Sequence, residues 1–277
     1  MAKVIICADD FAQSAAINAA ILALIEKGIV TATSCMTLSP AWRQSAGQLT
    51  AGIRARADIG LHLDFTQFSR TIRLPHPQLV LRSLLRLLDA SAIRANIRQQ
   101  LDAFEQATGT PPDYVDGHLH VHQLPVIRHA LLTEMQQRYG AMPASQRPWL
   151  RISSPPAGSG FKARMIHWLG ASALQRAATA AGFRVSPCLL GVYDFQGDMT
   201  AYQAHWATWS RQLHQYVHAQ GNSLPPVLMC HPSNPENGVD EQDAIANARV
   251  IEWQVMQSAD FATWLSQADI QAVKGSH

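Results

Sequence analysis

Seven short apolar runs recur along the chain, and longer segments with apolar residues at helical spacing separate them. This alternation is typical of a parallel β-sheet whose strands are joined by crossover helices. Because the runs are continuous, they indicate strands that are buried on both faces. The predicted strands are residues 3–10, 31–38, 58–64, 114–120, 149–153, 186–192 and 226–231. The sequence therefore predicts an α/β protein with about seven parallel strands.

Several segments between these runs carry helix boundaries. Ser14 is placed to cap a helix and Gly28 to end it, and a helix over residues 91–108 is followed by Gly109. Further helices are predicted at residues 125–139, 161–181, 199–220 and 244–257, and a loop at residues 153–160.

Residues 65–90 interrupt the alternation, with a proline-rich turn at residues 75–77 followed by a leucine-rich stretch. One interpretation is a helix that packs its apolar face on the barrel, and the other is a lid or a dimer surface. Arg82 and Arg86 lie one turn apart, where they either flank an apolar groove or face water. We expect a single domain over residues 1–277 with an insertion at about 65–90.

The composition limits the class of protein. A chain of 277 residues can form one barrel of parallel strands, and 47% hydrophobic with 15% charged residues allows a large core. The net charge of +2 is too close to neutral for a nucleic-acid partner, which would require a clustered basic face. A small-molecule or glycoconjugate substrate is the expected partner, and a homo-oligomer is possible.

The cysteines and the N-terminal segment indicate the cellular compartment in which we expect the protein. Cys7, Cys35, Cys188 and Cys230 are widely separated within apolar runs, so we expect buried reduced thiols. The first apolar run ends at two aspartates, too early for a signal sequence or a transmembrane segment. The cytoplasm is the expected location.

Charged residues and histidines stand where the predicted strands end. Asp9 and Asp10 close the first strand, His62 and Asp64 the third, residues 116–122 the fourth, and His231 the seventh. In a parallel α/β fold these ends lie on the one face where active sites are built. We therefore expect these side chains to converge.

Carboxylates together with imidazoles are the ligands of a catalytic divalent metal, with three protein ligands leaving positions open for water and substrate. In a regular strand Asp9 and Asp10 would point to opposite sides, so that one could bind the metal and the other could act as a base. The alternative is that the two aspartates cap a helix or make surface ion pairs.

The fourth strand ends in three histidines spaced by two residues. If the segment stays extended, His118, His120 and His122 point to one side, and only some of them can share an ion with His62. A single histidine is more often structural, but such a cluster favours a functional site.

Together these motifs resemble the YdjC-like carbohydrate deacetylases, including the chito-oligosaccharide and hopanoid-associated (HpnK-type) branches. The resemblance covers most of the chain. Its residues are Ala8-Asp9-Asp10-Phe11, Gly28-Ile29-Val30-Thr31 with Met36, Gly60-Leu61-His62-Leu63, Asp116-Gly117-His118-Leu119-His120-Val121-His122, Arg151-Ile152 and Cys230-His231-Pro232.

The resemblance implies a distorted (β/α) barrel similar to a TIM barrel. It implies metal ligation by Asp10, His62 and His118, with Asp9 as catalytic base and His231 as candidate general acid. We place His120, His122 and Arg151 in substrate binding or behind the ligands; Arg151 either keeps Asp9 ionised or forms a structural ion pair.

The expected cofactor is one divalent metal ion, Mg²⁺ or Zn²⁺: the imidazoles favour zinc, whereas the resemblance indicates magnesium. The expected reaction is hydrolysis of an N-acetyl group on an amino sugar or glycoconjugate. Two alternatives stay open, a metal-dependent hydrolase of a phosphoester or another amide, and a non-catalytic sugar-binding or metal-binding protein.

One position departs from the family pattern, because Ala12-Gln13 stands where the family has Gly-Leu. Alanine disfavours a positive φ that glycine accepts, so we expect a changed loop shape near the metal.

Overall fold

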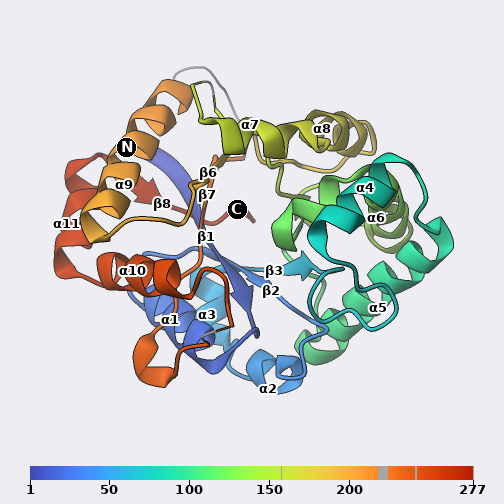
Figure 1. Cartoon of the computed structure of the whole chain (residues 1–277), viewed down its shortest axis with the longest axis horizontal. Coiled ribbons are helices and arrows are strands. Elements are labelled where there is room, and N and C mark those ends of the chain that lie inside the picture. The colour runs from blue at the N-terminus through green and yellow to red at the C-terminus, as the bar shows by residue number, and fades with distance from the viewer. Residues whose placement is uncertain (157, 218–223, 241, 277) are drawn as a thin grey trace.

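The structure of the protein is a computed structural model that describes residues 1–156, 158–217, 224–240 and 242–276 (Figure 1). Residue 157 of the predicted loop and residues 218–220 of the predicted helix at 199–220 lie outside the described residues.

The centre of the fold is a parallel sheet with the strand order β5-β4-β3-β2-β1-β7-β6. Its strands are β1 (Ala2–Phe11), β2 (Ala32–Cys35), β3 (Asp58–Leu63), β4 (Tyr114–Gly117), β5 (Trp149–Leu150), β6 (Leu189–Leu190) and β7 (Val227–Cys230). Each of the seven predicted strands is present, and every pairing between them is parallel. An additional short strand, β8 (Ile270–Ala272), was not predicted and pairs with the beginning of β1.

The sheet curls so that its two edge strands approach each other. The Leu150 N–H on β5 donates to the carbonyl of Arg184, and the Ser186 N–H donates back to Leu150. Further along, the Leu189 N–H on β6 donates to the carbonyl of Ser154. The expected α/β distorted barrel is therefore confirmed, with a closure between β5 and β6 that is irregular.

Helices surround this barrel in Figure 1. They are α1 (Ala15–Glu26), α2 (Trp42–Ala46), α3 (Ala51–Arg56), α4 (His76–Leu84), α5 (Ala90–Thr108), α6 (Pro125–Tyr139), α7 (Phe161–Trp168), α8 (Ala171–Ala180), α9 (Met199–Val217), α10 (Ala246–Met256) and α11 (Ala259–Gln267), with 3-10 segments η1 (His118–Gln123) and η2 (Pro235–Asn237). The Ser14 hydroxyl accepts from the Ile17 N–H and caps α1 as predicted. Gly109 ends α5 with a φ of 72°.

The helix predicted over residues 161–181 is instead two helices, because the chain breaks at Gly170. This residue has a φ of 129°, and a Cβ there would lie 2.4 Å from the carbonyl oxygen of Gln123. Only glycine fits this close approach without a shift of the backbone. The break makes α7 a separate helix beside the mouth of the barrel (Figure 1).

The barrel interior is filled at the end where the strands begin. The rings of Tyr114 and Trp149 stack with centroids 4.4 Å apart, and Gly60 leaves room for the Tyr114 ring. Near the C-terminus, the N–H groups of Gly275 and Ser276 both donate to Asp58. This end is therefore closed, and the opposite end, where the strands stop, is free to hold a site. All four cysteines are buried and unpaired, as expected.

The segment at residues 65–90 consists of a loop followed by α4. The Asp64 carboxylate accepts hydrogen bonds from the N–H groups of residues 66–69, and the Leu74 N–H donates to the carbonyl of Phe65, so that the loop is held at both ends. In α4 only Leu79 and Ser83 are buried. Most leucines of the segment face outward, and α4 does not pack its whole apolar face on the barrel.

Candidate functional site

Asp9 and Asp10 both point into the site, contrary to the alternation expected of a regular strand. The pairing of β1 with β2 shifts register between Ala8 and Phe11, and Asp10 adopts a φ of 70°. Aspartate tolerates this left-handed conformation better than most residues. The irregularity brings Asp9 Oδ2 to 3.9 Å and Asp10 Oδ1 to 3.4 Å from the Nε2 atom of His62.

Ala12 also adopts a left-handed conformation, with a φ of 76°. Its N–H donates to the side chain of Asn18 over 2.7 Å, and its carbonyl accepts from the Ser39 hydroxyl over 2.6 Å. Ala12 therefore adopts the positive φ that alanine disfavours, and these hydrogen bonds hold the turn. Such a backbone costs an alanine about 1–2 kcal/mol.

Asp10, His62 and His118 meet at the ends of three strands. One ligand atom from each lies within 4.8 Å of the others, and His118 Nδ1 is 3.0 Å from Asp10 Oδ1. One carboxylate and two imidazoles form the donor set of a three-ligand catalytic metal centre with open positions. The residues present therefore fit a divalent cation, and they are the three that the family resemblance implies as metal ligands.

Asp116 lies behind His62 and orients it. Its Oδ1 atom accepts from Nδ1 of His62 over 2.6 Å, which leaves Nε2 to face the cluster. A carboxylate behind a ligand histidine fixes its tautomer and increases its basicity. Burial opposes the charged imidazolium, but Asp116 and Asp9 outweigh it and raise the pKa of His62 to about 10 in the metal-free protein.

Arg151 is fully buried and forms a two-pronged ion pair with Asp9. Its NH1 lies 2.6 Å from Oδ1 and its NH2 lies 2.8 Å from Oδ2, while NH1 also lies 2.9 Å from Asp116. Burial by itself would raise the pKa of Asp9, but the guanidinium, with help from His62, holds it well below its usual range. Asp9 is therefore an oriented carboxylate that is ionised at neutral pH in the unliganded protein.

His231 faces Asp9 from the end of β7, with Nε2 3.9 Å from Asp9 Oδ2. Its backbone N–H donates to Glu252, and its ring packs edge-on against Phe195. Burial lowers the pKa of His231 to about 4, although Asp9 and Asp10 act in the opposite direction. The ring is therefore neutral at pH 7 in the metal-free protein.

The three histidines after β4 do not share one side, because the strand ends at Gly117. Leu119 and His120 adopt left-handed conformations within η1, and the segment is no longer extended. His120 accordingly bonds the hydroxyl of Ser153, and His122 donates to the carbonyl of Arg151 over 2.8 Å. His118 therefore joins Asp10, His120 lines the pocket wall, and His122 holds the backbone at Arg151, directly after β5.

Sequence reasoning missed Arg249, Glu252 and Asp243. Arg249 NH2 lies 2.7 Å from Asp10 Oδ2, and its Nε pairs with Asp243. Burial raises the pKa of Glu252 to about 7. The sequence could have indicated Arg249 and Glu252, because they are two charged residues three positions apart within a predicted helix. Both side chains are buried in α10.

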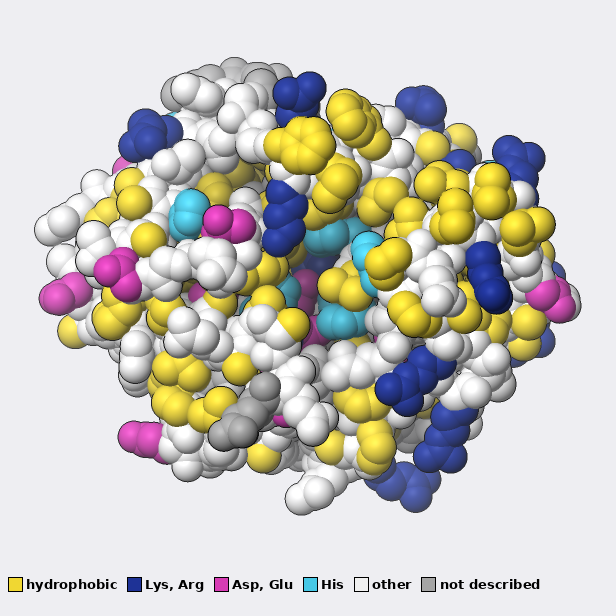
Figure 2. Space-filling view, viewed as in Figure 1, with side chains coloured by type: hydrophobic (Ala, Val, Ile, Leu, Met, Phe, Trp, Pro, Cys, Tyr) yellow, Lys and Arg dark blue, Asp and Glu magenta, His cyan; other side chains and the backbone are white. Residues whose placement is uncertain are grey.

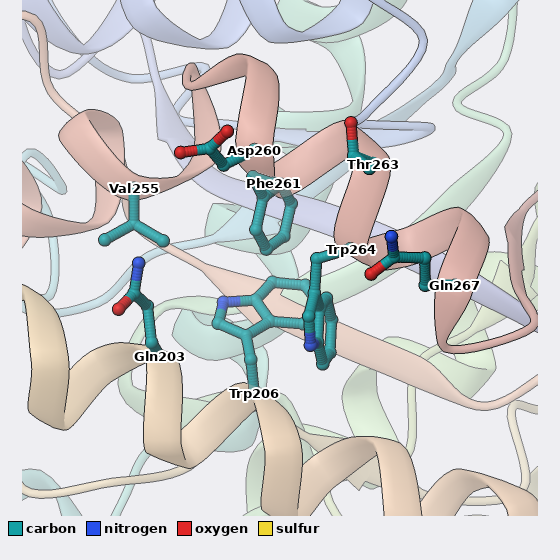
Figure 3. A pocket seen from close by; sticks show the side chains of 8 residues that line it. All are labelled: Gln203, Trp206, Val255, Asp260, Phe261, Thr263, Trp264 and Gln267. Carbon is teal, nitrogen blue, oxygen red and sulfur yellow. The ribbon is translucent and has the colours of Figure 1, made fainter.

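A pocket of about 750 Å³ at the open end of the barrel is lined by Asp9, Asp10, His62, His118 and His231. Figure 2 shows histidine and acidic side chains gathered in the central hollow of this face. Another hollow, between α9 and α11, is built around Trp206, Phe261 and Trp264 (Figure 3). The residues that line this second hollow include no histidine or cysteine. The pocket that contains Asp10, His62 and His118 is therefore the candidate active site.

Comparisons with known proteins identify a matching family and a similar fold. A family model described as YdjC-like protein matches residues 3–267. A carbohydrate deacetylase from Mus musculus is 28% identical over 199 residues, which are 65% of this chain and 59% of that relative, so the match spans about three fifths of the mouse protein. A crystal structure from Enterococcus faecalis V583, of a protein whose suggested role is cellobiose-phosphate cleavage, is 18% identical with a TM-score of 0.66 over 98% of this chain and 97% of that one. This last likeness concerns the fold.

Proposed function

This chain belongs to the YdjC-like protein family, and from that premise we propose that it is a divalent-metal-dependent hydrolase that removes an N-acetyl group from an amino sugar or a glycoconjugate. The observation that carries the proposal is the meeting of Asp10, His62 and His118 beside the Asp9–Arg151 ion pair in one pocket. The similarity to a carbohydrate deacetylase supports the choice of bond and substrate class.

Asp10, His62 and His118 would hold the cation. When bound, a divalent ion supplies a positive charge that acidifies water and polarises an acyl oxygen. Two imidazoles favour zinc or another transition ion, and the resemblance of the sequence keeps magnesium as the alternative. Arg249 and Asp116 orient two of these ligands, Asp10 and His62, before any ion arrives.

Asp9 would accept the proton of the attacking water. Arg151 fixes both carboxylate oxygens, while Oδ2 also faces the gap between His62 and His231. Because its pKa is depressed, Asp9 is a weak base, and it can act only on a water made strongly acidic by its surroundings.

His231 would deliver a proton to the departing amine. The neutral ring must first take up a proton, and Asp9 Oδ2, 3.9 Å from Nε2, is the donor that the geometry offers. The proton would thus pass from water to Asp9, then to His231, and finally to the leaving nitrogen. Protonation of that nitrogen is required because an amide anion is too basic to leave.

Residues 65–90 would border the acceptor pocket. Thr66, Gln67, Arg73 and His76 line its wall, directly after the strand that carries His62. We propose that this segment selects a bulky or partly apolar glycoconjugate, since its leucines extend outward from the same wall.

The proposal is tested by acetate release from a panel of N-acetylated glycans. The metal-stripped protein is the control, and phosphoesters and other amides are assayed in parallel. Acetate release that requires added metal supports the proposal. Turnover of phosphoesters without acetate release would favour the other metal-dependent hydrolase, and binding without turnover would favour a non-catalytic relative.

A further inference from the structure

Large apolar side chains are exposed on one side of the pocket mouth. They belong to α4 and the turn after it, to η1, and to α7: Leu81, Leu84, Leu85, Leu87, Leu119, Phe161, Met165 and Trp168. We call these eight residues the apolar rim; their exposed fractions range from 45% to 70%. Figure 2 shows apolar side chains above and to the right of the hollow, over α7 and α4 as placed in Figure 1. An exposed apolar surface of this kind marks an interaction site.

The apolar rim continues into the pocket. Leu119 and Met165 line the pocket and are also exposed to solvent. Leu119 has a φ of 51°, a conformation that is unfavourable for leucine and that persists only where its surroundings impose it. Leu119 therefore connects the apolar rim directly to the wall of the pocket.

The charges around the apolar rim are almost all positive. Residues 65–90 contain four arginines and, apart from Asp89, no acidic residue, while residues 158–180 contain no acidic residue at all. Arg73, Arg82, Arg86 and Arg164 are exposed, and none of them has a carboxylate within ion-pair distance among the described residues. The surface is therefore apolar and cationic together.

We propose that the apolar rim docks the protein on an anionic lipid bilayer, with the pocket opening toward the membrane surface. Leucine, phenylalanine and tryptophan side chains would enter the interfacial layer, and the arginines would contact anionic headgroups. Among the described residues, the helices include no candidate for a transmembrane span. The contact that we propose lies at the membrane surface. The surface has the combination of residues that such a contact needs.

The charge pattern argues against a second copy of this chain as the occupant. A twofold dimer places the same patch on both sides of the interface, so Arg82 and Arg86 would face their own like charges. Juxtaposed like charges oppose association, whereas anionic lipid neutralises them.

Cosedimentation with vesicles tests the proposal without substrate. The full chain should bind vesicles of phosphatidylcholine and phosphatidylglycerol in equal parts, and bind pure phosphatidylcholine about tenfold less. The Leu81→Gln/Leu85→Gln variant should lose about tenfold in partitioning, since two exposed apolar side chains are removed. The Arg82→Gln/Arg86→Gln variant should lose about as much at low salt, and high salt should abolish its difference from wild type.

Val239→Gln is the matched control, because Val239 is 54% exposed but lies outside the apolar rim. It should bind like wild type, and unchanged thermal unfolding of all variants establishes that they are folded. Wild type that ignores anionic vesicles, or leucine variants that bind as well as wild type, would overturn the proposal. So would a wild-type dimer that Leu81→Gln/Leu85→Gln converts to a monomer without any vesicle binding.

Discussion

Arg151 and Asp9 form two parallel hydrogen bonds inside the barrel, with nitrogen–oxygen distances of 2.6 and 2.8 Å. Neither side chain has more than marginal contact with solvent. Such a bidentate pair fixes both the charge and the orientation of the carboxylate before a substrate arrives. The candidate site thus contains a carboxylate whose pKa is held well below its usual range.

Asp9→Asn should keep metal binding and lose most turnover. The change removes the proton acceptor while nearly preserving shape, so kcat should fall by about 10²–10⁴-fold. It should also lower the free energy of unfolding by about 2 kcal/mol, because an amide NH₂ then faces the guanidinium. Asp58→Asn, at the closed end of the barrel, is the control that should affect stability but not kcat. A kcat equal to wild type in metal-loaded Asp9→Asn would rule out the base role.

His62→Ala should abolish tight metal binding, and Asp116→Asn should weaken it by about 10–100-fold, because Asp116 only orients the ligand. Titration calorimetry and metal analysis measure both effects. His120→Ala is the control, since His120 bonds Ser153 outside the cluster. If His62→Ala retains the stoichiometry and affinity of wild type, the ligand assignment is wrong, and His120 or His122 becomes the preferred ligand.

The metal-free protein should be most stable near pH 6.5. Burial lowers the pKa of His122 and His231 from 6.5 to about 4, so the unfolded chain binds more protons between these values, and stability falls as the pH drops through them. His62 acts in the opposite sense. Although burial opposes the charge, Asp116 raises its pKa to about 10, so its contribution is complete below 6.5 and is lost as the pH rises toward 10.

The change in pKa from 6.5 to about 4 limits the contributions of His122 and His231 to roughly 3 kcal/mol each, and the change from 6.5 to about 10 limits that of His62 to roughly 5 kcal/mol. Denaturant unfolding across the pH range measures the profile. His231→Asn should flatten the acid side and leave the alkaline side as it is. An acid side that is unchanged in this variant would contradict the assignment of His231.

The parallel strands could be predicted from sequence because each is a continuous buried run that ends at a polar residue. β8 was not predicted because it has only three residues, of which Gln271 is exposed, and so it forms no continuous apolar run. The break at Gly170 depends on a contact with Gln123, more than forty positions away, and no local pattern reports it.

Topology alone predicted that the polar residues at the strand ends converge, since parallel strands place their ends on one face. The choice of Asp10, His62 and His118 among them came from the resemblance to the family. The orientation of the individual side chains depends on local backbone conformations that sequence periodicity does not predict. One is the irregularity in β1 that turns Asp10 inward, and another is the end of β4 at Gly117. The Arg249–Asp10 pair joins residues 239 positions apart, and only the folded chain brings them together.

Ala12→Gly should stabilise the protein by up to about 1 kcal/mol. Glycine removes the cost of a positive φ, of about 1–2 kcal/mol, and the greater freedom of glycine in the unfolded chain offsets part of this gain. Ala19→Gly, in the regular helix α1, should instead cost about 1 kcal/mol. Thermal and denaturant unfolding of the two variants measure whether each substitution raises or lowers the free energy of unfolding. Equal destabilisation by both would mean that Ala12 is not strained.

The loop at residues 65–74 should control the use of large acceptors. Gln67 and Arg73 line the pocket wall, whereas Arg70 lies on the same loop without lining it. Gln67→Ala and Arg73→Ala should therefore raise KM for large N-acetylated glycans several-fold, while Arg70→Ala, the matched control, should not. Contacts remote from the reacting bond act through binding energy, so metal affinity and turnover of a minimal N-acetyl sugar should stay nearly unchanged.

Shortening the loop between Phe65 and Leu74 should have the same selective effect, because the hydrogen bond between these two residues closes the loop at its base. If large and minimal substrates respond alike, the loop only supports the barrel, and analytical ultracentrifugation of the shortened variant would then show whether it forms an oligomer contact.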